Sequence, residues 1–282
     1  MKKLRVIRRL ILILIVLSLI VTGVYTYFIS PTDYCFKNEV FTHKNISSQL
    51  NGFKIAFISD INLTNQDDIS RLNTIIDNLN EYAFDMLIFG GDLYEEKVFN
   101  TKDVAAILKK IHCKYGKFAI LGEKDEKSSI EIQQILNNGG FEVLNNETRT
   151  LYYKETSFEL IAASDDYDVS KLKQNAKLVT IGVCHQPDSF TKNKDYVDLQ
   201  LSGHSYGGSL YIPLLGPLST MEGAQIYNHG IYEEKKSSLI VSNGLSGPSS
   251  FPYKLFARNQ ILFVTLKSKQ FYSMNCLFCS IF

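Results

Sequence analysis

Apolar residues along this chain are grouped in two ways, and the first is a single long run near the N-terminus. No charged residue occurs from Leu10 to Thr32, and Tyr27 and Phe28 stand close to the end of this run. A helix that spans a bilayer needs about 20 apolar residues, and aromatic residues are typical of its interfacial ends. We therefore expect residues 1–30 to form a basic flank and a transmembrane anchor.

The basic flank indicates the orientation of this anchor. Five Lys and Arg residues occur before residue 10, so the N-terminus is expected inside the cell and the body of this single-pass protein outside the cell membrane. A cleaved signal peptide is the alternative. The segment Val21–Gly23 has no alanine at either small-residue position of a cleavage site, which favours an anchor that stays attached.

Beyond the anchor, short apolar runs alternate with helical stripes. A short apolar run bounded by turn residues predicts a buried strand, and apolar residues three or four positions apart predict a helix. Strands are expected at 53–59, 84–89 and 117–121, and helices at 67–81, 103–111 and 128–138.

The second part of the chain is predicted to contain mostly strands. Broken apolar runs indicate antiparallel strands over 141–163. Later strands are expected at 178–183, 197–201, 238–241 and 261–266. No repeat or low-complexity linker divides the chain, so we predict one α/β domain over 52–270. Residues 31–51 are interpreted as a polar connector with room for a first edge strand, and residues 271–282 as a hydrophobic C-terminal tail.

Composition and charge narrow the range of functions. Of the 282 residues, 45% are hydrophobic and 21% are charged, as in an ordinary globular protein. The chain has 30 Lys and Arg, five of them before residue 10, which leaves 25 against 29 Asp and Glu. Nucleic acid is not expected as a partner, because binding its phosphates needs a basic face.

Five acidic and histidine residues share one position, directly after a predicted strand. Asp60 and Asp92 follow the first two strands, the Glu123-Lys124-Asp125 cluster follows the third, and His185 and His204 follow two of the later ones. Open α/β sheets gather ligands just beyond the carboxyl ends of their strands. A single residue of this kind is commonly a cap or a structural group, whereas five in the same position predict one convergent site.

The order of these residues and their neighbours resembles the calcineurin-like metallophosphoesterase superfamily, most closely its small membrane-anchored bacterial members. The family pattern is D-x-H, G-D, G-N-H-D, a single H and G-H-x-H. The matching stretches are Asp60-Ile61-Asn62, Gly91-Asp92, Gly122-Glu123-Lys124-Asp125, Cys184-His185-Gln186-Pro187-Asp188 and Gly203-His204-Ser205-Tyr206. The resemblance covers nearly all of residues 53–267. It implies a sandwich of two mixed β-sheets flanked by helices, preceded by one transmembrane helix.

The resemblance also implies which residues hold two metal ions. The positions that correspond to the ligands of the first ion are Asp60, Asn62, Asp92 and Tyr206. Those that correspond to the ligands of the second are Asp92, Glu123, His185 and His204. The family has histidine where Asn62 and Tyr206 stand, and asparagine where Glu123 stands.

These substitutions do not affect the two metal positions equally. Glu123 adds a full negative charge, so it is a better ligand than asparagine for a hard or borderline dication. Asn62 offers only a neutral amide oxygen, and Tyr206 a phenol that is largely un-ionised near neutral pH. We expect one firm divalent-metal site at the second position and a weakened first site. Mn, Fe, Zn and Mg all accept such mixed ligands.

Lys124 stands where the family has its general-acid histidine, and it is the expected catalytic residue here. Its ammonium group is suited to neutralising phosphate charge as a fixed cation. The function implied is metal-dependent hydrolysis of a phosphoester or phosphodiester, with weak activity. The alternative is a catalytically inactive module that binds a phosphorylated or lipid-linked partner. The partners expected are the membrane, through the N-terminal helix, and a phosphorylated small molecule or lipid-linked phosphodiester.

Overall fold

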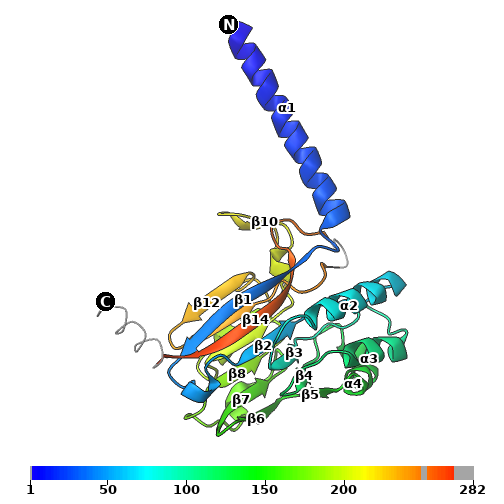
Figure 1. The fold of residues 1–282 in the computed structure, drawn as a ribbon. Helices are drawn as coiled ribbons and strands as arrows, with labels where there is room; N and C mark the ends of the chain where they lie inside the picture. The colour runs from blue at the N-terminus through cyan, green and yellow to red at the C-terminus, as the bar shows by residue number, and fades with distance from the viewer. Residues whose placement is uncertain (1, 249–252, 270–282) are drawn as a thin grey trace.

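A single apolar helix projects from the body of the protein at its N-terminal end (Figure 1). The structure is a computed structural model that describes residues 2–248 and 253–269. Helix α1 spans Lys2–Val24 and continues as one π-helical segment, η1, over Tyr25–Ile29. Within the described residues, this is the one helix long and apolar enough to cross a membrane, and none of its apolar window is buried against the body. A signal sequence near the N-terminus would meet the same criteria of length and composition.

The body contains two mixed sheets, and the first holds the residues predicted to alternate between strand and helix. Its six strands within the described residues have the order β1-β14-β2-β3-β4-β5. Their bounds are Tyr34–His43 for β1, Asn259–Ser268 for β14, Lys54–Ile58 for β2, Met86–Phe89 for β3, Lys117–Ala119 for β4 and Phe141–Val143 for β5. Helices α2 (Gln66–Leu79), α3 (Thr101–Lys109) and α4 (Ser129–Asn138) connect the parallel strands and cover one face of the sheet (Figure 1).

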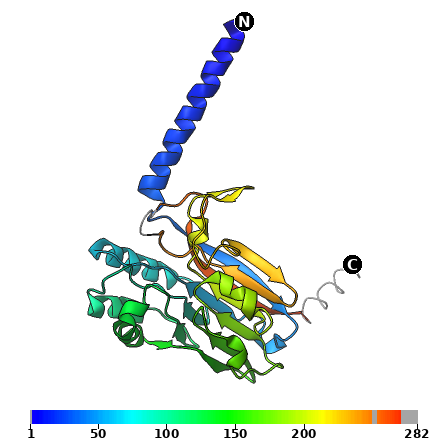
Figure 2. The same cartoon turned by 180° about the vertical axis from the view of Figure 1, so that it is seen from behind.

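The second sheet packs against the other face of the first. Its six strands within the described residues have the order β12-β13-β9-β8-β7-β6. Their bounds are Gly230–Glu234 for β12, Ser237–Val241 for β13, Leu199–Ser202 for β9, Thr180–Val183 for β8, Thr156–Ala162 for β7 and Glu147–Tyr153 for β6. The short helix α5, Phe190–Asn193, lies on the outer side of this sheet (Figure 2). A small hairpin of β10 (Tyr211–Ile212) and β11 (Gly216–Pro217) stands apart from both sheets.

The main core lies between the two sheets. Phe57, Ile88 and Leu262 of the first sheet share one buried cluster with Ile181 and Leu199 of the second. A separate cluster fills the space between the first sheet and helices α2 to α4. This arrangement confirms the predicted class, an α/β sandwich of two mixed sheets flanked by helices.

The strand directions place the loops after β2, β3 and β4 at the end of the sheet where α1 joins it. Strand β1 begins shortly after η1 and leads away from that end, and β14 runs parallel to β1. Strand β2 is antiparallel to β14, and β3 and β4 are parallel to β2. These three strands therefore point back toward the anchor, and so do the residues at their carboxyl ends.

Several short contacts fix the end of the N-terminal helix to the body. The Ser30 hydroxyl accepts the backbone N–H of Lys254 at 2.9 Å, and the Ser30 carbonyl accepts the side-chain amide of Asn259 at 3.2 Å. Asp33 accepts two hydrogen bonds of 2.7 Å from the guanidinium of Arg258. The junction is thus held by the start of β14 and the residues just before it.

The strand pairing differs from the sequence-based expectation in one region. Residues 141–163 were expected to form antiparallel strands, and β6 and β7 do pair in that way. Strand β5, however, pairs in parallel with β4, because α4 leads the chain back across the sheet as the earlier helices do.

The connector contributes β1 as the edge strand. The expected C-terminal tail at 271–282, with Cys276 and Cys279, lies outside the described residues.

Candidate metal centre

The five residues predicted from the strand ends meet between the two sheets. Asp60, Asp92 and Glu123 follow β2, β3 and β4, while His185 and His204 follow β8 and β9. Nε2 of His185 lies 3.3 Å from Oδ2 of Asp92, 3.1 Å from Oε2 of Glu123 and 3.9 Å from Oδ1 of Asp60. Nδ1 of His204 lies 3.0 Å from Oε1 of Glu123. Each sheet therefore supplies part of one cluster.

Backbone carbonyls determine which nitrogen of each histidine faces this cluster. Nδ1 of His185 lies 2.6 Å from the carbonyl oxygen of Gly90, and Nε2 of His204 lies 2.6 Å from that of Glu222. A carbonyl oxygen only accepts hydrogen bonds, so each of these nitrogens carries the proton. Burial lowers the pKa of both imidazoles, but Asp92 and Glu123 outweigh this at His185 and Glu123 does so at His204, so the pKa of each ring is raised. The ring nitrogen that faces the carboxylates offers a lone pair in the neutral form, which is the form that binds a metal ion. Metal-binding histidines in proteins are oriented in this way.

The donor atoms at the second metal position have no hydrogen-bond partner among the described residues. They are Asp92 Oδ2, Glu123 Oε2, His185 Nε2 and His204 Nδ1. Buried polar atoms are normally paired, and lone pairs that face one another repel unless a proton or a metal ion lies between them. The ligand atoms of Glu123, His185 and His204 lie within 4.8 Å of one another, and those of Asp60, Asp92 and His185 form a second such group. Carboxylates and imidazoles suit a divalent metal ion. The residues present therefore fit one metal ion at this position.

The first metal position is different, because Lys124, Tyr206 and Asn62 are bonded to one another there, while Asn62 Oδ1 has no hydrogen-bond partner among the described residues. The Lys124 ammonium donates to Tyr206 Oη at 2.6 Å and to Glu95 Oε2 at 2.7 Å, and lies 3.8 Å from Asp92 Oδ2. Asn62 Nδ2 donates to Tyr206 Oη at 2.9 Å and to Ser246 Oγ at 2.8 Å. At the first metal position, where Asn62 and Tyr206 stand in place of two family histidines, the Lys124 ammonium thus supplies the positive charge beside Asp92.

The phenol of Tyr206 is a poor metal ligand in this environment. Burial, followed by the negative charges of Asp60 and Asp92, holds the pKa of Tyr206 well above its usual range. The phenol consequently stays neutral at any ordinary pH. Its oxygen already accepts hydrogen bonds from Asn62 and Lys124, so a cation would have to displace existing partners to bind it.

The backbone at the site adopts a conformation that L-residues rarely use. Positive φ angles of 48° to 64° occur at Asp60, Asn62, Asp92, His204 and Tyr206. Strained backbone of this kind persists only where surrounding contacts enforce it, and it is concentrated at functional sites. Close packing contributes to the constraint. A Cβ atom at Gly203 would lie 2.5 Å from Oδ2 of Asp60, so only glycine lets these two loops approach each other.

Asp125 holds two of the ligand loops together without facing the cluster. Its carboxylate accepts backbone N–H groups from Asp92, Leu93 and Gly122 at 2.8 to 3.0 Å. Burial, with a further contribution from Asp92, raises the pKa of Asp125 to about 6. The aspartate of the third motif is therefore a positioning residue in this fold.

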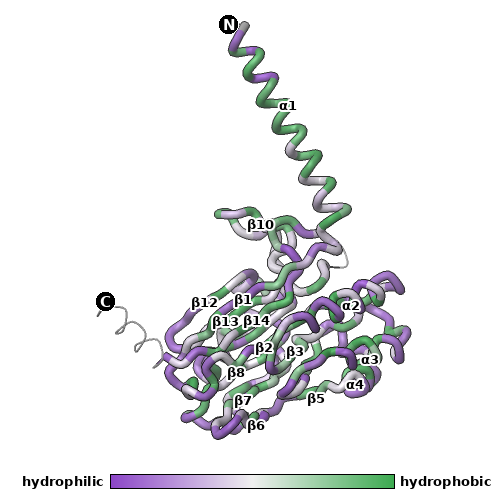
Figure 3. The backbone as a smooth tube through the Cα atoms, in the orientation of Figure 1, coloured by the Kyte–Doolittle hydropathy of each residue, from purple (hydrophilic) through white to green (hydrophobic). Residues whose placement is uncertain are grey.

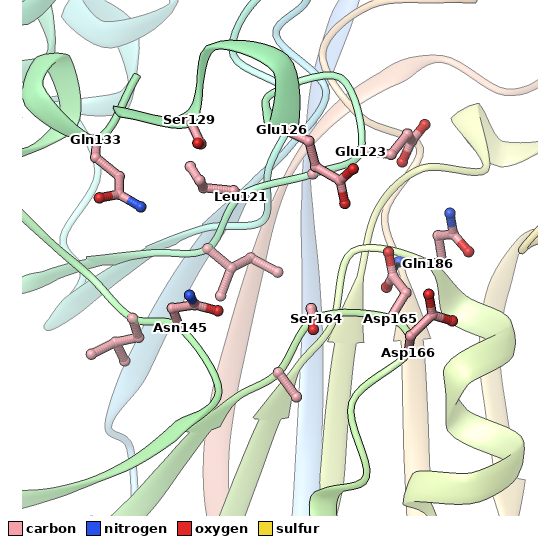
Figure 4. Close-up of a pocket in the computed structure, with 14 residues that line it drawn as sticks. Leu121, Glu123, Glu126, Ser129, Gln133, Asn145, Ser164, Asp165, Asp166 and Gln186 are labelled. Carbon is pink, nitrogen blue, oxygen red and sulfur yellow. Dashed lines mark hydrogen bonds between the residues drawn. The ribbon is translucent and has the colours of Figure 1, made fainter. Parts of the chain in front are cut away.

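A cavity of about 370 Å³ opens beside Glu123 (Figure 4). Its walls carry the acidic side chains of Glu126, Asp165 and Asp166, and no Lys or Arg is among its lining residues within the described chain. Ser129, Gln133, Asn145, Ser164 and Gln186 add uncharged polar groups. The cavity thus offers hydrogen bonds and negative charge next to the metal centre.

Two residues near the site were not predicted from the sequence. Glu95 pairs with Lys124 but follows no predicted strand, so it lacked the positional signal of the other acidic residues. Lys254 lies behind Tyr206, with its ammonium nitrogen 5.7 Å from the ring centroid. It is 1% exposed, and a buried lysine has no distinctive sequence signal.

Comparison with known proteins agrees with this geometry. The chain is 30% identical over 254 residues to the metallophosphoesterase YkuE of Bacillus subtilis (strain 168), which covers 86% of this chain and 87% of that protein. It is 28% identical over 181 residues to the phosphodiesterase YaeI of Escherichia coli (strain K12), covering 60% of this chain and 67% of that protein. It is 22% identical over 249 residues to a transmembrane protein with a metallophosphoesterase domain from Danio rerio, covering 79% of this chain and 55% of that protein.

No family model matches the chain. The similarity to YkuE extends over most of both proteins, and it agrees with the two-sheet fold and the cluster of Asp, Glu and His residues. The chain belongs to the calcineurin-like metallophosphoesterase family. Use of a divalent metal ion follows from that membership and from the donor set.

Proposed function

We propose that this protein is a membrane-tethered phosphoesterase that holds one divalent metal ion and hydrolyses a phosphoester or phosphodiester slowly. The observation that carries the proposal is the contrast between the two metal positions. At the second position Glu123, His185 and His204 offer ligand atoms within 4.8 Å of one another, and donor atoms of these residues lack hydrogen-bond partners among the described residues. At the first position Lys124 and Asn62 both donate to Tyr206. The ligands of the single ion are Asp92, Glu123, His185 and His204, with Asp60 beside them.

The bound ion would supply Lewis-acid activation of a phosphoryl oxygen. Lys124 neutralises phosphate charge from the side of the first position, at which its ammonium already lies 3.8 Å from Asp92. An ammonium group carries one positive charge and does not lower the pKa of a water molecule as a metal ion does. Slow turnover follows, because two-metal sites stabilise both the attacking and the leaving oxygen.

The position of the site supports a substrate at the membrane surface. The ligand loops after β2, β3 and β4 lie at the anchor end of the first sheet. A lipid-linked phosphodiester is reached directly from that end. The acidic cavity beside Glu123 favours a cationic or hydroxyl-rich group next to the phosphate, since Glu126, Asp165 and Asp166 would repel a second phosphate.

The test is a measurement of metal content and turnover in the full chain, purified from membranes without chelators. We expect one ion per chain, its loss in His185→Ala, and its retention in the matched control Asn62→Ala. Hydrolysis of a generic phosphodiester with added Mn²⁺ should be far below about 1 s⁻¹. Two tightly bound ions per chain, one of them lost in Asn62→Ala, would contradict the proposal.

The second candidate function is binding without turnover, and the ion pair of Lys124 with Glu95 favours it. That pair is 2.7 Å long and both side chains are mostly buried, so Lys124 is held in place by the protein itself. In this case Lys124, together with an ion that Asp92, Glu123, His185 and His204 would hold, would retain a phosphate group without activation of a water molecule. Metal-dependent phosphate binding with no measurable hydrolysis distinguishes this function from slow catalysis.

A further inference from the structure

The small β10–β11 hairpin carries strongly exposed leucines. Leu214 and Leu215 at its tip are 103% and 84% exposed, and Leu218 after β11 is 64% exposed. No charged residue occurs from Ser209 to Met221. An apolar, charge-free projection of this kind is unusual on a soluble surface and marks a contact site.

The hairpin lies at the end of the body where α1 joins it. Figures 1 and 2 show it beside the base of that helix in both views, and Figure 3 shows the apolar character of the helix above it. Leu210, at the start of the hairpin, forms β-bridges with Leu255 and Phe256, and the Phe256 side chain is 62% exposed. At the base of the anchor, Tyr27 stacks on Tyr253 with ring centroids 4.9 Å apart.

We propose that the β10–β11 hairpin enters the interface of the same bilayer that α1 spans and forms a second lipid contact. This inference rests on the membrane tether of the proposed function. A lipid surface is the occupant that fits, because the patch lies beside the apolar anchor and the stacked tyrosines. Aromatic side chains of this kind are enriched at membrane interfaces, and a charge-free apolar tip suits the boundary between headgroups and acyl chains.

Both ends of the hairpin segment are attached to the metal centre. Tyr206 begins the turn η6, Tyr206–Gly208, that leads into the hairpin. After the hairpin, the carbonyl of Glu222 accepts the ring N–H of His204 at 2.6 Å. Contact between Leu215 and lipid would therefore hold the metal centre at a fixed height above the headgroups.

The chain has no tryptophan, so one introduced tryptophan reports its own surroundings. Three single variants of the full chain, Leu215→Trp, Leu14→Trp and Tyr152→Trp, are reconstituted in phosphatidylcholine vesicles. Leu14 lies in α1 and reports the tether. Tyr152 is 78% exposed on β6, which Figure 1 places at the end of the body away from α1, and serves as the matched control. Replacing part of the lipid by bromine-labelled lipid quenches only tryptophans that touch the bilayer.

We expect strong quenching and a blue-shifted emission for Leu215→Trp and Leu14→Trp, and neither change for Tyr152→Trp. Quenching at Leu14 without quenching at Leu215 would overturn the hairpin contact and leave the tether intact. An absence of quenching at Leu14 would remove the tether, and the hairpin contact with it. Equal quenching of all three variants would mean that the body lies flat on lipid, which also overturns the proposal.

Discussion

Replacing Lys254 by methionine removes a charge-bearing group from the interior while keeping the length of the side chain. Lys254 is 1% exposed, and its amino group donates one hydrogen bond to the carbonyl of Asn243. Burial lowers the pKa of Lys254 from its ordinary value of 10.5 to about 7, although the negative charge of Asp60 acts in the opposite direction. The folded protein thus disfavours the charged form that the unfolded chain prefers.

The size of the effect follows from this pKa difference. Each tenfold change in a protonation equilibrium corresponds to about 1.4 kcal/mol, so keeping Lys254 inside costs about 4 kcal/mol of folding free energy at pH 7. Loss of this hydrogen bond leaves the buried carbonyl of Asn243 without its lysine donor, which offsets about 1–3 kcal/mol of that. We expect Lys254→Met to be about 1–3 kcal/mol more stable than the parent at pH 7.

The pH dependence of the folding free energy tests the sign of this stability difference separately. Between about pH 7 and pH 10.5 the unfolded chain binds a proton at Lys254 that the folded protein does not, so the stability of the parent rises with pH in this range. The advantage of Lys254→Met is therefore fully present below about pH 7 and disappears as the pH approaches 10.5. Urea unfolding of the full chain in detergent, followed by circular dichroism at several pH values, measures both quantities.

The matched control is Lys102→Met on the exposed surface of α3, for which we expect a change within about 0.5 kcal/mol. The reasoning is refuted if Lys254→Met is less stable than the parent at pH 7. That result would mean that the buried ammonium is charged and stabilised by Asp60. A gain in stability that does not change with pH would equally rule out the protonation account.

The remaining predictions concern the metal centre and the anchor. The triple variant Asn62→His, Lys124→His, Tyr206→His restores the family ligands and the general acid. It should raise Mn²⁺-dependent phosphodiesterase activity on the order of 10²-fold. An unchanged rate would show that these residues do not limit turnover. Glu123→Gln removes one ligand charge and should weaken Mn²⁺ binding at least about tenfold in calorimetric titration, whereas unaltered affinity would exclude Glu123 as a ligand. Mass spectrometry of membrane-fraction protein should find the N-terminal segment intact, and a mature N-terminus near Val24 would contradict the anchor.

The elements of this fold are predictable from sequence because each strand is a short apolar run with a turn residue at its end. Strand β2, at Lys54–Ile58, and helix α2, at Gln66–Leu79, lie within two residues of their expected bounds. The pairing is less predictable. Tyr34 of β1 is opposite Asn259 of β14, and this contact between distant parts of the chain gives no local signal in either segment.

The candidate ligands are predictable for a different reason, namely that parallel strands bring their carboxyl ends to one edge. Position alone identified Asp60, Asp92 and the Glu123-Lys124-Asp125 cluster as neighbours, and the family resemblance singled out Glu123. It did not identify the partner of Lys124, because Glu95 lies in a loop whose path depends on tertiary packing. The left-handed backbone at the site was equally hidden, since residues such as Asp60 and Tyr206 are not glycine and their sequence gives no sign of positive φ.

For the proposed membrane-tethered phosphoesterase, the short junction between α1 and β1 would determine how the site reaches a substrate. Only residues 30–33 separate η1 from β1, a stretch that spans about 14 Å at most when fully extended. Once α1 is in a bilayer, the body has no flexible stalk and stays within about its own thickness of the headgroups. Its encounters with membrane-bound esters then become a two-dimensional search at high effective concentration, while soluble esters still arrive by diffusion from bulk solution. Selectivity between two chemically similar phosphoesters can thus come from where each molecule resides, without any difference in how the pocket fits them.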